Sequence, residues 1–423
     1  DYYASRGLGD VYKRQNLYRM KNAIKRFKGW GLLPRIIIAI AAGVGVGLIA
    51  PEWLARTAAT FNAIFGEFLG FCIPLIILGF VAPAIADIGV RAGKMLVATI
   101  ALAYGFTLMA GFGAYFTGVW LFPSMIEPAS YVAQEAQAVR IQPYFTIAMP
   151  AALTVMSALL LAFITGLGTA FLPTDGLKRL LGEFRSIIDM LIRKAIVPLL
   201  PYYIFCIFLN MAVTGEVATV ASTFIKIIAV IFVLHVAVLL FQYSVAAPFS
   251  TTTRNPLRLL WSMMPAYFTA LGTQSSAATI PVTLERTIAM GVDRDVAGFT
   301  VPLCATIHMS GSALKLTACA LALMIAHGMP YTTGMFAGFI AMLGVTIVAA
   351  PGVPGGAVMA ALGLFTSLLG FTQADCALMI ALYIAMDSFG TACNVTGDGA
   401  ISIILNRWFG RRPQPNRNQT AEA

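Results

Sequence analysis

Four polar side chains recur in an apolar segment near the end of the chain at positions i, i+4, i+7 and i+11, namely Asp387, Thr391, Asn394 and Asp398. This period places them on one face of a helix. Asn394 and Asp398 provide hard oxygen donors one turn apart, which suits a small cation. The two aspartates would lie about 16 Å apart on a continuous helix, too far to share a proton as an aspartic-protease pair does. The pattern predicts a binding site, and the alternative is a buried polar contact between helices.

Two other polar or flexible runs interrupt apolar segments upstream. Ser275 and Ser276 lie in the first run, where small hydroxyl side chains at a helix break can donate hydrogen bonds to a substrate carboxylate. Hydroxyl residues also join membrane helices, so this signal is weak on its own. The second run, residues 351–356, is rich in proline and glycine and includes Val353 and Gly355. Its composition is typical of a mobile gate or of a plain extracellular loop.

The overall composition decides which class of protein carries these residues. The chain is 59% hydrophobic and 11% charged, whereas a soluble domain carries roughly 25% charged residues. This excludes a soluble enzyme, a nucleic-acid binder and a disordered protein, and it makes the placement of the net charge of +10 more informative than its sum. The 6 cysteines include no Cys-x-x-Cys pair, so we expect buried thiols and no cofactor. We predict a polytopic α-helical membrane protein in contact with the lipid bilayer, and not an enzyme.

The apolar segments predict eight membrane-spanning helices, at about 34–51, 61–87, 94–122, 145–172, 185–213, 217–247, 296–325 and 376–405. Two more apolar stretches, 256–290 and 333–371, contain the interruptions described above. Backbone groups freed at such breaks must be buried in protein or line a watery cavity. We therefore predict two re-entrant helical hairpins, and paired broken segments of this kind indicate a transport site near the midplane of the membrane.

The distribution of lysine and arginine predicts how the chain is oriented. Cations precede the first span and recur in alternate loops, which places both termini in the cytoplasm by the positive-inside rule. Residues 1–30 are expected to be a cytoplasmic segment, in which 1–15 lack helical periodicity and are interpreted as a sequence-assembly artefact. Residues 31–410 are expected to form a single transporter unit, followed by a cytoplasmic tail at 411–423.

Three motifs have the order and spacing found in the dicarboxylate/amino acid:cation symporters: Ser275-Ser276 with Pro281-Val282-Thr283, Gly352-Val353-Pro354-Gly355, and Asn394-Val395-Thr396-Gly397-Asp398. The chain thus resembles this sodium:dicarboxylate, glutamate-transporter-like family over nearly its whole length after residue 30. The resemblance implies an all-α elevator fold and a homotrimer in the plasma membrane, which would be the inner membrane of a bacterium. It places the scaffold mainly in 31–250 and the transport core mainly in 254–405, with contributions from 94–122.

The resemblance also implies two sets of site residues. The substrate set is Ser275, Ser276, Val353, Gly355, Asp387, Gly390, Thr391 and Asn394. Within it, Asp387 matches the aspartate that holds a substrate amino group, and Val353 matches the lid of the second hairpin. The cation set is His308, Ser310, Asn394 and Asp398, with Na⁺ and/or H⁺ as the coupling ion.

Departures from the family pattern narrow the expected substrate. Gly390 replaces the arginine found one turn after the aspartate in members that carry acidic substrates, and Gln274 occupies the alternative arginine position. Without a guanidinium group, a second substrate carboxylate lacks a bidentate partner. We therefore predict import of a small organic solute, favouring a neutral amino acid, with a C4-dicarboxylate as the alternative. A channel or a non-transporting sensor on the same fold is the alternative from another class.

The seventh span departs further from the pattern. His308-Met309-Ser310-Gly311-Ser312 stands where the family has Asn-Met-Asp-Gly-Thr, and Lys315 follows one turn later. An intramembrane lysine is usually functional. It could replace one sodium ion as a tethered cation paired with Asp398, carry a proton with His308 as relay, or pack structurally. A Ser312–Lys315 hydrolase dyad lacks an oxyanion hole. We predict fewer coupled sodium ions than in ordinary family members.

Overall fold

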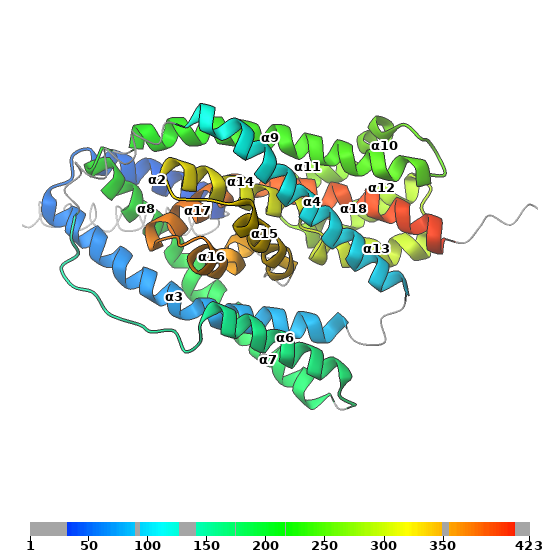
Figure 1. Cartoon of the computed structure of the whole chain (residues 1–423), viewed down its shortest axis with the longest axis horizontal. Coiled ribbons are helices and arrows are strands. Elements are labelled where there is room, and N and C mark those ends of the chain that lie inside the picture. The colour runs from blue at the N-terminus through cyan, green and yellow to red at the C-terminus, as the bar shows by residue number, and fades with distance from the viewer. Residues whose placement is uncertain are drawn as a thin grey trace, which may run out of the picture.

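The computed structural model describes residues 32–88, 94–126, 141–173, 175–215, 217–348 and 355–410. All the regular elements in these ranges are helices, which agrees with the predicted all-α fold (Figure 1). The predicted cytoplasmic segment 1–30, the tail 411–423 and the tip of the second hairpin with Val353 lie outside the described residues.

The first half of the chain forms long helices. They are α2 (Leu32–Gly47), α3 (Glu52–Ile88), α4 (Lys94–Met125), α6 (Val155–Phe171), α7 (Gly176–Leu191), α8 (Val197–Val213) and α9 (Val217–Ala246), with a π-helical turn at Ile192–Ile196 joining α7 to α8. Glycines allow close packing between some of them. A Cβ atom on Gly43 would lie 2.5 Å from the carbonyl oxygen of Phe205, so α2 and α8 approach each other at backbone distance.

The second half consists of shorter helices that end and restart inside the molecule. They are α10 (Pro256–Ser262), α11 (Met264–Thr273), α12 (Ser276–Ala289), α13 (Arg294–Ile307), α14 (Ser310–Ala326), α15 (Thr333–Val348), α16 (Gly356–Leu368), α17 (Gln373–Ala385) and α18 (Asp387–Phe409). The first predicted hairpin corresponds to α11 and α12, which meet at Gln274 and Ser275. The second corresponds to α15 and α16, on either side of the undescribed tip.

Three predicted spans differ from the structure. The span expected at 296–325 is present as the candidate span Arg294–Ala326, but it consists of α13 and α14 with an unpredicted interruption at His308 and Met309. The span expected at 376–405 is α17 followed by α18, bent by 62° at Met386. The span expected at 145–172 begins only at Val155, after a non-helical stretch from residue 141. Apolar composition alone conceals such breaks, because the residues on both sides stay buried and hydrophobic.

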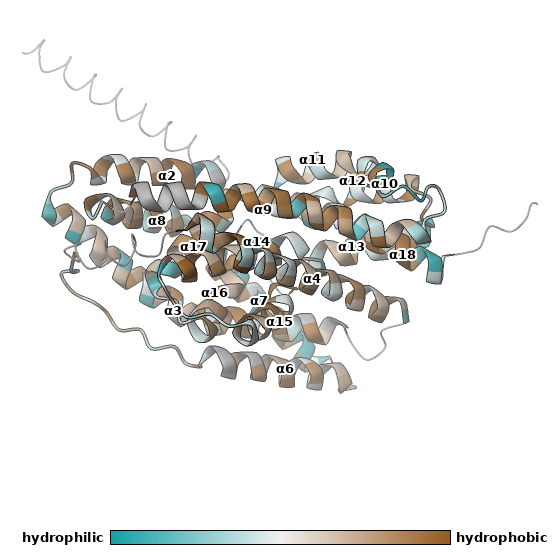
Figure 2. Cartoon of the chain, turned by 45° about the horizontal axis from the view of Figure 1, so that its top comes forward, coloured by the Kyte–Doolittle hydropathy of each residue, from teal (hydrophilic) through white to brown (hydrophobic). Residues whose placement is uncertain are grey.

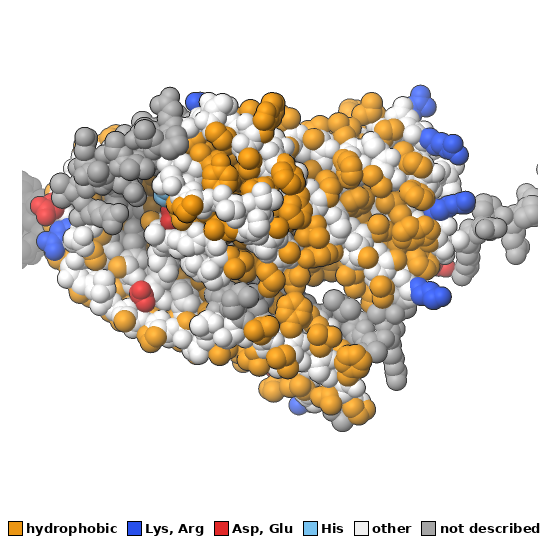
Figure 3. Space-filling view, viewed as in Figure 1, with side chains coloured by type: hydrophobic (Ala, Val, Ile, Leu, Met, Phe, Trp, Pro, Cys, Tyr) orange, Lys and Arg blue, Asp and Glu red, His pale blue; other side chains and the backbone are white. Residues whose placement is uncertain are grey.

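The described helices have the lengths and surfaces of a membrane protein. Among the described residues, 5 helical stretches are long and apolar enough to cross a bilayer, or 6 if α17 and α18 are counted as one span. Two of the 5 join helices named above, α7 with α8 and α13 with α14. The predicted number of eight spans therefore stays a prediction. Figure 2 shows apolar residues along most of the helices, and Figure 3 shows hydrophobic side chains across the middle of the molecule, with lysine and arginine gathered toward one end. Large apolar side chains such as Trp120 and Ile164 are exposed, as expected for a surface in contact with lipid.

Candidate functional site

The first hairpin turns through an unusual backbone conformation. Gln274 has a φ of 54° and is the one non-glycine residue with positive φ among those that the structure describes. A left-handed conformation is costly for a residue with a Cβ atom and is often found at functional sites. The Ser275 side chain accepts a hydrogen bond from the backbone N–H of Ala278 and so caps α12. The Gln274 amide donates to the Ser388 hydroxyl at 3.0 Å, which ties the hairpin to α18.

A cavity lies where several helices begin. Its lining includes residues at or near the N-termini of α12, α14, α16 and α18, namely Ser276, Ser312, Gly356 and Asp387. The cavity volume is about 210 Å³, below the roughly 300–1,000 Å³ of sites for drug-sized ligands, so it suits a small solute. Helix N-termini carry unpaired backbone N–H groups and partial positive charge. The cavity therefore favours an anionic group such as a carboxylate.

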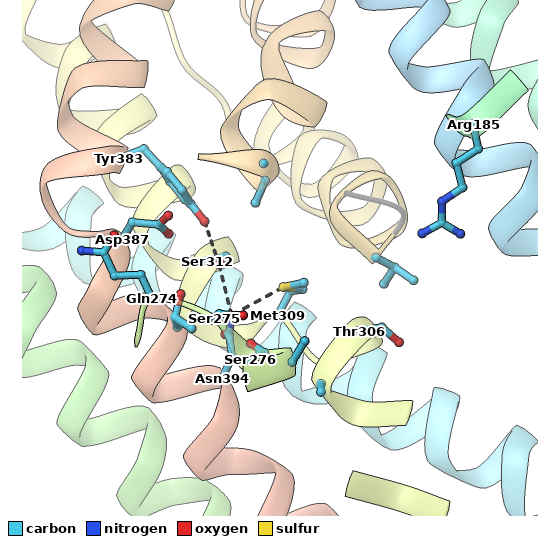
Figure 4. A pocket seen from close by; sticks show the side chains of 16 residues that line it. Arg185, Gln274, Ser275, Ser276, Thr306, Met309, Ser312, Tyr383, Asp387 and Asn394 are labelled. Atoms are coloured by element: carbon cyan, nitrogen blue, oxygen red, sulfur yellow. Dashed lines mark hydrogen bonds between the residues drawn. The ribbon is translucent and has the colours of Figure 1, made fainter. Parts of the chain in front are cut away.

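Asn394 joins the two broken helices at the floor of the cavity (Figure 4). Its Oδ1 accepts from the backbone N–H of Gly311 at 2.8 Å, and its Nδ2 donates to the Ser312 hydroxyl at 3.2 Å. Ser312 also lies 3.0 Å from the hydroxyl of Tyr383 on α17. A Cβ atom on Gly311 would lie 2.7 Å from the carbonyl oxygen of Gly390, so a glycine is required for α14 to approach α18 this closely.

Asp387 is held on both carboxylate oxygens. Its Oδ2 accepts from the backbone N–H of Gly355 at 2.8 Å, and its Oδ1 lies 3.3 Å from Nζ of Lys315. Gly355 has a φ of 79°, a conformation that favours glycine. The carboxylate also belongs to the first turn of α18, where a negative charge is stabilised. Asp387, at the start of α18, thus connects the second hairpin to α14.

Lys315 is fully buried on α14 and faces the start of α18. Besides Asp387, its Nζ donates to the carbonyl oxygen of Met386 at 3.3 Å and lies 3.6 Å from the centre of the Tyr383 ring. The carboxylate, the carbonyl group and the aromatic face together compensate the buried ammonium group. Of the alternatives left open for Lys315, the pairing with Asp398 is therefore wrong, because Asp387 is the carboxylate that Nζ reaches.

A second buried cluster surrounds Asp398. Nδ1 of His308 lies 2.9 Å from Oδ1 of Asp398 and 3.1 Å from the carbonyl oxygen of Asn394. Both of these partners are acceptors, so Nδ1 carries the hydrogen atom. Nε2 of His308 accepts from the side-chain amide of Gln242, which also donates to the Ser310 hydroxyl at 3.1 Å. All five side chains of this cluster are buried.

The predicted residues thus fall into two groups. Five of the substrate set line the cavity, namely Ser275, Ser276, Asp387, Thr391 and Asn394. Gly355 contacts Asp387, whereas Gly390 is buried behind the cavity against Lys315. His308, Ser310 and Asp398 form the separate cluster around Gln242, which Asn394 joins through its carbonyl oxygen. Val353 lies outside the described residues.

Several lining or supporting residues were not predicted as part of the site. Arg185 on α7 reaches toward the cavity from the side opposite α18, as Figure 4 shows, but in the sequence it is one more cation in a loop region. Tyr383 and Gln242 stand in apolar runs without a recognisable motif. An isolated glutamine such as Gln242 within a membrane span was the available signal, because a buried amide needs polar partners.

Comparison with known proteins identifies the family of the chain. The profile of the sodium:dicarboxylate symporter family matches residues 32–408. The chain belongs to this family. The family consists of membrane symporters rather than enzymes, and sodium is its coupling ion. The resemblance inferred from the three motifs is therefore confirmed.

Individual relatives are named for different substrates. The serine/threonine transporter SstT of Enterococcus faecalis is 26% identical over 407 residues, which is 89% of this chain and 91% of that protein. An excitatory amino acid transporter of Caenorhabditis elegans is 30% identical over 225 residues, 51% of this chain and 44% of that protein. The neutral amino acid transporter B(0) of Rattus norvegicus is 30% identical over 175 residues, 40% of this chain and 30% of that protein. The chain thus matches less than half the length of the two animal relatives.

Proposed function

We propose that this protein is a secondary active symporter that imports a small organic solute with a carboxylate group, driven by a cation gradient. The observation that supports this most strongly is the cavity bordered by residues near the N-termini of α12, α14, α16 and α18. Helix ends of this kind, meeting at broken membrane segments, suit an anionic solute group. Family membership and the names of the relatives support the same activity.

We also propose that the two halves of the chain have different roles in transport. Residues 31–250 act mainly as a scaffold, and residues 254–405 form the moving core with part of 94–122. Arg185 on α7 borders the cavity together with residues of α12 and α18, as expected if the cavity lies where the core faces the scaffold. We further propose a homotrimer with cytoplasmic termini in the plasma membrane. Crosslinking in native membranes tests the trimer, and labelling of a cysteine introduced near residue 410 from each side tests the orientation.

The cation site is the least conventional part of the proposal. Asn394, Asp398 and Ser310 offer oxygen atoms, but the Nδ1–H of His308 already donates to two of them. A sodium ion needs those oxygen lone pairs for itself. The residues at Asp398 therefore do not fit a sodium ion while His308 keeps this orientation. This supports coupling to fewer sodium ions than the family pattern implies.

Two solute classes are compatible with family membership, a neutral amino acid and a C4-dicarboxylate. The sequence favours the amino acid because Asp387 is retained, and the names of the relatives include transporters of serine, threonine and neutral amino acids. That preference assumes an Asp387 carboxylate that is free to bind an ammonium group. In the structure this carboxylate already has an ammonium partner.

Counterflow in proteoliposomes tests the proposed activity. Vesicles loaded with an unlabelled carboxylate should accumulate the same labelled compound when a sodium or proton gradient is imposed. A channel would dissipate the label, a hydrolase would consume it, and a sensor would bind it without exchange. Absence of exchange for every amino acid and carboxylate tested would contradict the symporter.

A further inference from the structure

The Asp387 carboxylate has a positively charged partner on one oxygen and a backbone N–H donor on the other. The ammonium group of Lys315 lies 3.3 Å from one oxygen, and the backbone N–H of Gly355 lies 2.8 Å from the other. The Lys315 side chain is completely buried. Among the described residues that line the cavity, Asp387 is the one carboxylate. The cavity therefore offers no uncompensated negative charge to an ammonium group on a solute.

Gly390 makes this arrangement possible. A Cβ atom at this position would lie 2.5 Å from both Cε and Nζ of Lys315. The lysine thus fills the space beside Asp387 that any side chain at 390 would enter. The two departures noted in the sequence, the glycine and the lysine, are two parts of one structural feature.

Displacement of Lys315 by a solute is unfavourable. The other contacts of Nζ are the Met386 carbonyl oxygen and the ring of Tyr383, and neither carries a charge. A solute ammonium group that took Asp387 would leave a buried lysine without its counter-ion. The two cations would also repel each other in a low-dielectric interior. A hydroxyl group on the solute has no such conflict, because it can donate to a remaining lone pair of the carboxylate.

The other charges near the cavity favour a net negative solute. Arg185 contributes a guanidinium group to the lining, and the N-termini of α12, α14, α16 and α18 contribute partial positive charges. Asp387 already compensates the N-termini of α16 and α18, because it accepts from the N–H of Gly355 and lies in the first turn of α18. Arg185 and the N-termini of α12 and α14 are the positive groups that remain without a carboxylate of the described lining. A zwitterion would supply a carboxylate together with an ammonium group that has no partner.

We propose that Lys315 is a specificity-determining residue that takes the place of a substrate ammonium group at Asp387, so that the solute is a small carboxylate without an amino group. The inference rests on the proposed symport function and specifies its substrate class. Lys315 acts through Asp387 and does not itself contact the solute.

Pairs of compounds that differ in one group test this directly. Lactate and alanine, glycerate and serine, and malate and aspartate each differ by a hydroxyl in place of an ammonium group. Thermal shift and counterflow of the wild-type protein should favour the hydroxy member of at least one pair by more than tenfold in apparent affinity. Lys315→Met frees the Asp387 carboxylate and should move the preference toward the amino member of that pair by at least tenfold.

Further variants separate specificity from a general defect. Lys315→Met combined with Asp387→Asn removes both charges and should abolish the gain for the amino compound. Gly390→Ala pushes the end of Lys315 away from Asp387 and should weaken the hydroxy preference even if Lys315→Met does not fold. Lys226→Met is the matched control, because this exposed lysine on α9 contacts the Met125 carbonyl oxygen away from the cavity. It should behave as the wild type.

The outcomes distinguish this inference from the proposed function. A wild-type protein that carries serine, alanine or aspartate better than the hydroxy partner would overturn the role of Lys315 and leave the symporter proposal intact. The same holds if Lys315→Met and Gly390→Ala fold and both keep the wild-type preference. Exchange of none of the six compounds would overturn both.

Discussion

The Nδ1 atom of His308 lies 2.9 Å from Oδ1 of Asp398, and both side chains are buried at the point where α13 ends and α14 begins. The carbonyl oxygen of Asn394 is the second acceptor of the same N–H group, at 3.1 Å. The imidazole of His308 therefore donates its hydrogen bond to oxygen atoms of Asn394 and Asp398, the two residues that were expected to bind a cation. Together with Lys315 at Asp387, it means that both buried aspartates of α18 have basic side chains as partners.

We expect His308→Asn to increase the dependence of transport on sodium. The shorter amide removes the N–H donor from Asp398 and supplies an oxygen atom that can coordinate a hard cation. Initial uptake in proteoliposomes should rise more steeply with sodium concentration than in the wild type. His308→Gln at the same site is a control for loss of the ring. Identical sodium curves for the wild type and His308→Asn would contradict the interpretation that His308 occupies a cation position.

The sequence predicted a large part of this site because its helix breaks carry distinctive residues. Hydroxyl residues occur at the turn of the first hairpin, around Ser275. Asp387, Asn394 and Asp398, which were predicted to share one helical face, all belong to one helix, α18. The partners of the two aspartates could not be predicted in this way. Lys315 and His308 lie on or just before the same helix, about two turns apart. Which aspartate each of them reaches depends on how α14 crosses α18.

The helix break at Met386 also could not be predicted from the sequence. Residues 376–405 are continuously apolar apart from the polar face, and they contain no proline. The 62° bend lies between the end of α17 at Ala385 and the start of α18 at Asp387. Tertiary contacts from Gly355 and Lys315 stabilise this arrangement, and such long-range contacts leave no local signal.

Gln242→Leu should destabilise the protein. The Gln242 amide donates to the Ser310 hydroxyl and to Nε2 of His308, so its loss leaves two buried acceptors unpaired. An unpaired buried polar group costs about 1–3 kcal/mol, which should lower the unfolding temperature of the purified protein by several degrees. Ser244→Ala on the same helix removes a local bond to the Leu240 carbonyl on the exposed surface and should leave it unchanged. Equal stability of Gln242→Leu and the wild type would contradict a structural role for the amide.

Gly311→Ala should impair both folding stability and transport. The new Cβ atom would lie 2.7 Å from the Gly390 carbonyl oxygen and 2.8 Å from Cβ of Cys393, so α14 must move away from α18. Overpacking of this kind costs about 1–3 kcal/mol, and the shift separates Lys315 from Asp387. Gly298→Ala on α13, where a Cβ atom meets nothing within 4 Å, is the matched control. Normal uptake by both variants would show that the close helix contact is dispensable.

Arg185→Gln should weaken the affinity for the solute. Arg185 lines the cavity from α7, opposite the hairpin and α18, and contributes a guanidinium group to a lining that contains Asp387 as its described carboxylate. Removal of this positive charge should raise the half-saturating concentration for a carboxylate about tenfold, equivalent to about 1.4 kcal/mol. The effect should diminish in high salt, because the cavity is open on one side and salt screens the charge. Concentration-dependent uptake in proteoliposomes measures it.

Arg179→Gln is the matched control for this change. Arg179 lies on the same helix, is largely exposed and pairs with Glu183, so its loss should leave uptake as in the wild type. If Arg185→Gln and Arg179→Gln have the same half-saturating concentration, the guanidinium group of Arg185 does not act on the solute. In that case the electrostatic attraction for an anion comes from the helix N-termini alone, and removal of the Ser275 cap by Ser275→Ala should have the larger effect, since it disturbs the first turn of α12.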